Sequence, residues 1–262
     1  AMLLALNRTR AKTGVSIKGA HLEHGIRGEE SKSDAEHVKH LCKSINVECF
    51  FGAVDVPSLS KAMGLSLEDA ARRARNRFFL EACADQNSEA VALGHTANDQ
   101  SETILMHLIR GSGLDGLTGM KLLSDRVIEK DPTLRVFRPL LEIARTDIDA
   151  YCAAVDETPR IDSTNLSDEY TRNAVRHNLL PALENFNPRI TDALNRLAIS
   201  ARRDLEFIEE ASYGAWVAAA DVEHGIVTID LDKLTNLPES LSYRLIRKAI
   251  GIIKGNLNGI TL

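Results

Sequence analysis

The sequence predicts an α/β protein built on a doubly wound parallel sheet, with a smaller, mainly helical domain at its C-terminal end. Short apolar runs of strand length alternate with amphipathic helical patterns up to about Leu141. Polar turns follow these runs, at the edge where open parallel sheets bind ligands. Beyond Asn187-Pro188 the pattern is almost entirely helical. We therefore expect domains over residues 1–187 and 188–262.

Composition narrows the functional classes. The 262 residues are 44% hydrophobic and 26% charged, as in a globular protein. No run approaches the roughly 20 apolar residues of a membrane span, so no membrane partner is expected. The four cysteines include no C-x-x-C pair and predict reduced thiols in a cytosolic protein. With a net charge of −5, nucleic acid would have to bind local basic patches.

The first elements alternate between helix and strand. We expect a helix over 1–7, strands over 15–20 and 47–51, and helices over 31–45 and from Ser66 to about 83. The turn after the first strand carries His21 and His24 on either side of Glu23. This pattern fits a structural pair and a ligand site equally well.

A strand over 90–93, ended by Gly94, leads into the helix that centres the predicted site. His95 and Asp99 are four residues apart and would share one side of its first turn. An imidazole and a carboxylate there suit proton transfer or metal-bound phosphate chemistry. The local pattern alone favours a plainer alternative, in which Asp99 or Asn98 caps the helix and His95 is a loop hydrogen bonder.

The helix that begins at Ser66 carries Arg72, Arg73, Arg75 and Arg77. Such a cluster is usually a solvated face. It would bind phosphate only if it faced the same crevice as His95, because guanidinium groups pair with phosphate in a bidentate way.

The pattern of apolar residues is less regular in the rest of the chain. Residues 121–130 are weakly patterned, and 156–170 form a polar loop. Elsewhere we expect a strand over 134–137, helices over 146–155, 171–185, 189–220 and 239–253, and a short strand within 224–231. Pro181 should kink or restart its helix.

Six motifs lie in register along residues 1 to about 200. They are HLEHGIR (21–27), ARRAR (71–75), GHTANDQSET (94–103), RGSG (110–113), RPLL (138–141), and DSTN (162–165) with Asp168, Tyr170, Arg172, Asn173 and Arg176. Together they resemble the tRNA(Ile)-lysidine synthetases of the PP-loop ATP pyrophosphatase group. The resemblance implies an adenine nucleotide alpha hydrolase-like fold.

The resemblance also implies an activity. ATP would adenylate the wobble cytidine of tRNA(Ile), and free L-lysine would then displace AMP to give lysidine. ATP and Mg²⁺ are the implied cofactors, and a homodimer is left open. The implied catalytic residues are His95 and Asp99, with Asp99 also the metal ligand. The remaining implied site residues bind substrate or tRNA (Arg72, Arg75, Asp168, Arg172, Asn173, Arg176) or ATP (His24, Gly25). The helical domain would contact tRNA phosphates.

The sequence departs from the family pattern in several places. The family's glycine-rich S-G-G-x-D-S loop is absent, and residues 1–6 resemble the helix that follows it. We expect the first strand and this loop to lie upstream of Ala1, and part of the tRNA-binding region to be missing as well. Asn98 stands where many relatives carry aspartate, and Asn76 replaces a usual tyrosine.

Three alternative classes of protein fit the sequence less well. A PP-loop tRNA thiolase relies on paired cysteines, which this sequence lacks. A non-catalytic RNA-binding relative is disfavoured by the presence of both His95 and Asp99. A dinucleotide-binding oxidoreductase needs G-x-G-x-x-G after a strand, whereas residues 111–116 follow a helix.

Overall fold

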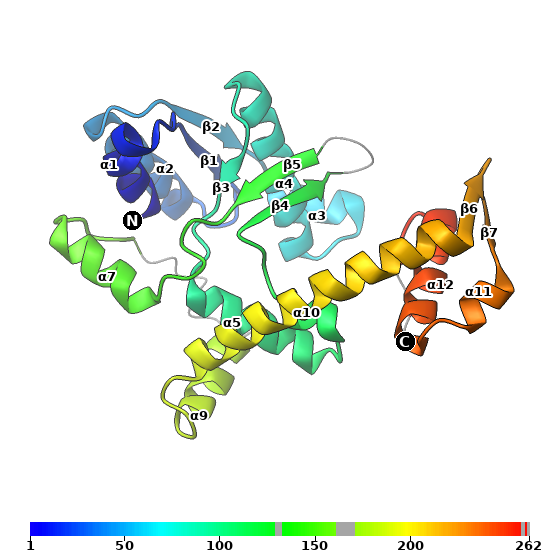
Figure 1. Cartoon of the computed structure of the whole chain (residues 1–262). Helices are drawn as coiled ribbons and strands as arrows, with labels where there is room; N and C mark the ends of the chain where they lie inside the picture. Colours follow the sequence, from blue (N-terminus) through cyan, green and yellow to red (C-terminus); the bar gives the residue numbers. More distant parts are fainter. Residues whose placement is uncertain (129–132, 161–170, 258–259, 261–262) are drawn as a thin grey trace. The chain divides into compact units, whose positions relative to one another are not determined.

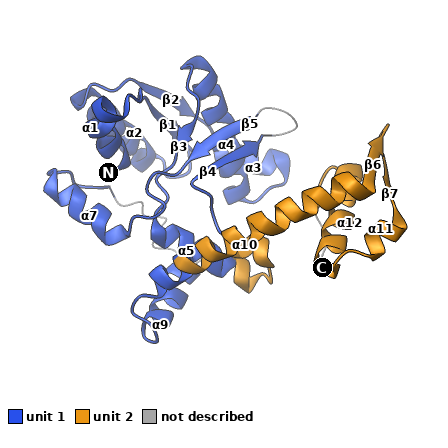
Figure 2. Cartoon of the chain, in the orientation of Figure 1, with its two compact units in different colours: residues 1–106, 119–195 blue, residues 107–118, 196–262 orange. Residues whose placement is uncertain are grey.

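The computed structural model describes residues 1–128, 133–160, 171–257 and 260. The chain forms two compact units, residues 1–106 with 119–195 and residues 107–118 with 196–262 (Figure 2). The division lies within helix α10 (Ile190–Ala219) rather than at Asn187-Pro188. The start of α10 belongs to the first unit because Asn195 Nδ2 donates to the Ala97 carbonyl at 3.2 Å. Asp168 and the DSTN segment lie outside the described residues.

The strands of the first unit confirm the α/β class. Strand β1 (Gly19–Glu23) pairs in parallel with β2 (Cys49–Ala53). Strand β3 (Val91–Ala92) pairs in parallel with β5 (Thr133–Phe137) (Figure 1). The weakly patterned stretch contains a strand that was not predicted, β4 (Leu123–Val127), antiparallel to β5. Its residues alternate between exposed and half-buried, so it has no continuous apolar run.

Strand β1 begins and ends later than predicted. Its register with β2 pairs Gly19 with Cys49 and Glu23 with Ala53, which places His21 and Glu23 inside the strand. A Cβ atom at Gly19 would come within 2.8 Å of Cys49 Sγ. A larger residue at this position would therefore force a neighbour to shift.

The helices of the first unit are α1 (Met2–Thr13), α2 (Glu29–Ser44), α3 (Val56–Met63), α4 (Leu67–Asp85), most of α5 (Ala97–Ile109), α7 (Arg145–Ala154), α8 (Thr171–Ala174) and α9 (Leu180–Glu184). Ser66 caps α4 as predicted, because its Oγ accepts from the Asp69 N–H at 3.1 Å. Helix α3 was not predicted.

The predicted disturbance at Pro181 takes the form of a wide turn. A π-helical segment, η2 (Val175–Leu179), joins α8 to α9. Proline lacks the N–H that would bond to the preceding turn, and a π-helical turn accommodates the lost bond. Arg172 and Arg176 lie on this stretch, so the irregularity helps set the direction of both side chains.

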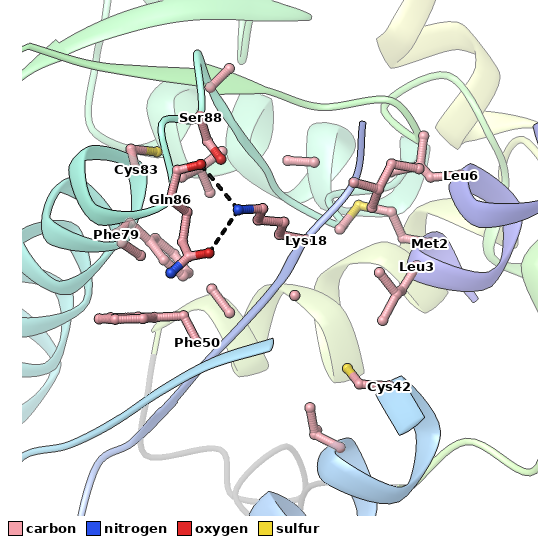
Figure 3. Close-up of a pocket in the computed structure, with 18 residues that line it drawn as sticks. Met2, Leu3, Leu6, Lys18, Cys42, Phe50, Phe79, Cys83, Gln86 and Ser88 are labelled. Atoms are coloured by element: carbon pink, nitrogen blue, oxygen red, sulfur yellow. Dashed lines mark hydrogen bonds between the residues drawn. The ribbon is translucent and has the colours of Figure 1, made fainter. Parts of the chain in front are cut away.

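A cavity of about 200 Å³ lies between β1 and β3, which are not hydrogen-bonded to each other in the described residues (Figure 3). Most of its lining is apolar, including Leu3, Phe50 and Phe79. Lys18 crosses one side, where its Nζ donates to the Gln86 carbonyl at 3.3 Å and to Gln86 Oε1 at 2.9 Å. The described sheet therefore consists of two separate pieces.

The second unit is mainly helical. It contains α6 (Leu114–Leu117), most of α10, the hairpin of β6 (Ala220–Glu223) and β7 (Ile226–Ile229), α11 (Leu231–Thr235) and α12 (Glu239–Lys254). Its core joins the end of α10 to α12 through Trp216, Ala219, Leu245 and Ala249. In neither unit do the described helices include one with the length and apolar character that a bilayer crossing needs.

Candidate functional site

The start of α5 forms a reciprocal cap just past β3. Asp99 Oδ2 accepts from the Thr96 N–H at 2.8 Å and from Thr96 Oγ1 at 2.9 Å. In return, the Asp99 N–H donates to Thr96 Oγ1 at 3.3 Å. Asn98 does not cap this helix, because its Oδ1 accepts from the Arg145 N–H at the start of α7. One oxygen of Asp99 thus has the capping role that the plainer alternative expected.

The other oxygen of Asp99 faces two arginines. Asp99 Oδ1 lies 3.5 Å from Arg172 Nη2 and 3.3 Å from Arg176 Nη2. Both arginines reach it from α8 and η2, more than 70 residues along the chain. The structure therefore brings together three predicted site residues.

Glu102 lies in the candidate site, although the sequence did not predict it there. It is 1% exposed, and its Oε2 accepts from Arg172 Nε at 2.8 Å. Arg176 donates to both of its oxygens, from Nε at 2.6 Å and from Nη2 at 3.0 Å. These bonds and the carboxylate charge raise the pKa of Arg176. The sequence feature that could have identified Glu102 is its position three residues after Asp99, on the same face of the helix.

The bonds to Glu102 and Asp99 use the Nε and Nη2 atoms of each guanidinium. Within the described residues, these arginines show no bond through Nη1. About a third of each side chain is exposed, 35% for Arg172 and 34% for Arg176. Both arginines are therefore held in place while still presenting hydrogen-bond donors.

His95 is a neutral imidazole at pH 7. Burial lowers its pKa to about 4, with the charge of Asp99 opposing the shift and those of Arg138, Arg172 and Arg126 adding to it. Its Nδ1 is buried without a hydrogen-bond partner among the described residues. An unpaired polar atom in this position can accept or donate one hydrogen bond to a substrate.

His24 follows β1 and lies within electrostatic reach of Arg75 on α4. Burial lowers the pKa of His24, and the nearby charge of Arg75 lowers it further. Gly25 has a φ of +66°, and a Cβ there would lie 3.1 Å from the Val54 carbonyl oxygen. The predicted ATP-binding role of His24 and Gly25 stays a prediction.

Arg75 is half-buried on α4, and the charges of Arg126 and Arg172 from other elements act on it. Arg72 pairs with Asp69 and Arg77 with Glu81 on exposed positions, as on an ordinary solvated face. Burial lowers the pKa of Arg75, and so do the charges of Arg126, Arg72 and Arg172. Asn173 is 8% exposed in α8.

The predicted metal ligand, Asp99, already has hydrogen-bond and ion-pair partners in this structure. Both oxygens of Asp99 already face N–H, O–H or guanidinium donors. Across the described ranges, no group of three or more His, Cys, Asp or Glu side chains converges as metal ligands would. Asp99 as a metal ligand stays a prediction.

The carboxyl ends of these parallel strands carry histidine and arginine side chains, at the edge where open α/β sheets bind ligands. Residues 1–183 match the profile of the PP-loop domain, and the chain belongs to this family.

Curated relatives match along almost the whole chain, and each is a tRNA(Ile)-lysidine synthase. The protein of Clostridioides difficile is 36% identical over 259 residues, covering 98% of this chain and 54% of the relative. That of Clostridium perfringens is 35% identical over 262 residues, covering 100% and 54%. That of Dehalococcoides mccartyi is 34% identical, covering 99% and 55%. The chain thus spans about half the length of these relatives.

One solved structure supports the fold alone. The U34-tRNA thiolase NcsA from Methanococcus maripaludis, with its [4Fe-4S] cluster, aligns with a TM-score of 0.59 at 15% sequence identity. The alignment covers 78% of this chain and 67% of the thiolase.

Proposed function

We propose that this chain is part of an enzyme that uses ATP to join free L-lysine to the wobble cytidine of tRNA(Ile). The observation that carries the proposal is similarity to tRNA(Ile)-lysidine synthases over 98% or more of this chain. The products are lysidine, AMP and pyrophosphate. A cytoplasmic location follows from the tRNA substrate, and the homodimer stays a prediction.

The reaction has two displacements. The carbonyl oxygen of the cytosine attacks the α-phosphorus of ATP, and the bond to pyrophosphate breaks. The lysine ε-amine then attacks the activated ring carbon, the bond to AMP breaks, and the amine releases a proton to solvent. Each displacement develops negative charge on phosphate oxygens, which fixed cationic donors stabilise.

The described residues divide the supporting roles. Arg172 and Arg176 present guanidinium donors whose positions Glu102 and Asp99 hold. A pre-positioned donor needs little reorganisation as charge develops. His95, neutral at pH 7, offers a hydrogen bond rather than a positive charge. Asn173 and Asp168, which lies outside the described residues, complete the proposed substrate-binding set. The helical unit would contact tRNA phosphates.

We also propose that a strand carrying a glycine-rich loop completes the sheet between β1 and β3. The support is the apolar cavity that separates these strands. The protein from its natural source should then have an intact mass above 28.8 kDa. A mass of 28.8 kDa would contradict upstream residues.

Substitution of Asp99 tests the catalytic assignment. In the full-length protein, Asp99→Ala should abolish tRNA-dependent ATP–pyrophosphate exchange, while tRNA affinity in a gel shift stays within a few fold. Glu81→Ala, which removes the exposed partner of Arg77 on α4, is the matched control. Retained exchange would mean that the wrong carboxylate was assigned. If the unsubstituted protein binds tRNA without exchange, a non-catalytic RNA-binding relative is the better description.

A further inference from the structure

Two half-buried arginines lie on the same side of the β3–β5–β4 sheet. Arg126 in β4 is opposite Leu134 in β5. Leu134 belongs to a core cluster against which Phe79 of α4 packs. Arg75 precedes Phe79 by one helical turn and therefore shares its face of α4. Both side chains therefore lie on the facing sides of α4 and the sheet, where the charge of Arg126 acts on Arg75.

Neither guanidinium has an ion pair or a side-chain hydrogen bond within the described part of the chain. The nearest contrast is Arg135, on the other face of the same strand pair, which binds Asp125 at 3.1 Å. The charge of Arg126 also lowers the pKa of a third arginine, Arg138. Glu68 contributes a weaker opposing charge to Arg75.

Like charges held together away from water disfavour each other's charged form. Burial lowers the pKa of both Arg75 and Arg126. The charge of Arg126 lowers the pKa of Arg75 further, and the charge of Arg72 lowers that of Arg126. An arginine stays protonated in a protein, so the repulsion is present in the unliganded state. An anion between the two groups would remove it and would accept hydrogen bonds from two planar forks.

We propose that Arg75 and Arg126 together bind one phosphate group of a substrate. Arg126 is the new element, because neither the motifs nor the comparisons assign it a role. The identity of the ligand rests on the proposed function, which supplies two phosphate sources. One is the ATP phosphate chain, and the other is the tRNA backbone beside the target cytidine.

Binding measured without ATP turnover tests this site separately from the enzymatic proposal. The probes are inorganic pyrophosphate, followed by calorimetry, and the anticodon stem-loop of a tRNA(Ile) with a wobble cytidine, followed by fluorescence anisotropy. Arg126→Gln should lower the affinity for at least one probe by about tenfold. Arg126→Lys should lower it by less, because lysine keeps the charge but lacks the planar guanidinium that binds phosphate through two hydrogen bonds. Arg135→Gln is the matched control and should leave both affinities unchanged.

The pattern of losses identifies the phosphate. Loss confined to pyrophosphate indicates the nucleotide, and loss confined to the stem-loop, with a shallower salt dependence, indicates the RNA backbone. Unchanged affinity for both probes in Arg126→Gln overturns the proposal, as does failure of the unsubstituted protein to bind either. The urea midpoint of Arg126→Gln without ligand should equal or exceed that of the unsubstituted protein, because a like charge is removed. A lower midpoint would make Arg126 a structural brace and would also overturn the proposal.

Discussion

Two arginine pairs in the first unit differ in whether a carboxylate of the fold balances their charge. Arg172 and Arg176 meet a buried carboxylate, Glu102, with further contact to Asp99. Arg75 and Arg126 meet other positive charges and have no paired carboxylate in the described ranges. The first pair has its counter-charge within the fold, so it can stabilise the protein. The second pair lacks one and is suited to an incoming anion.

Removal of the internal counter-charge should have the largest effect. Glu102→Gln leaves the two guanidiniums facing a neutral amide, and breaking a buried ion pair costs roughly 3 kcal/mol of unfolding free energy. Urea unfolding followed by circular dichroism measures it. Asp69→Asn, which breaks an exposed pair with Arg72, should cost less than about 0.5 kcal/mol. Equal losses in the two variants would show that Glu102 is not a special counter-charge.

His95 reports on both pairs, because the charges of Arg172 and Arg126 act on it. Its pKa is about 4 when folded and 6.5 in the reference state, so the unfolded chain binds more protons between these values. Its contribution to stability is therefore fully present above pH 6.5 and is lost as the pH falls toward 4. The expected loss is about 1–2 kcal/mol for a partly exposed group.

The measurement is urea unfolding across this pH range for the unsubstituted protein and for His95→Gln. The variant cannot titrate at this position, so its curve should fall less steeply toward low pH. His21 and His24 titrate in both proteins and cancel in the difference. Parallel curves would place the pKa of His95 near its ordinary value.

Salt dependence of RNA binding gives the smallest expected effect. Arg176→Ala should weaken binding of the stem-loop and reduce the slope of log K against log salt by about 0.7 to 0.9, the value for one phosphate contact. The same titration on Arg126→Gln compares the two pairs directly. An unchanged slope for Arg176→Ala would leave Arg176 with the purely bracing role that its bonds to Glu102 already show.

Local patterns predicted many of the elements. Ser66 caps its helix as expected, and the helix after Gly94 begins within a few residues of its predicted start. The predictions of strands were wrong where strand pairing determines the structure. Strand β4 has no apolar run and pairs with β5. The bounds of β1 follow from its register with β2.

The residues of the candidate site likewise divide into those that the sequence predicted and those that it did not. The resemblance led to Asp99, Arg172 and Arg176, and the fold brings them together. Neither Glu102 nor Arg126 was predicted, although Glu102 lies inside a recognised motif. A glutamate in a polar helix turn and an arginine in a weak strand look like surface residues until their neighbours are known.

The sequence by itself determined the α/β class, most of the helices and the stretch around His95, because periodicity, caps and short motifs are properties of neighbouring residues. Only the tertiary structure decided which arginines are neutralised and which are not. Glu102 and Arg176 are 74 positions apart, and so charge balance between them is set by packing rather than by local sequence.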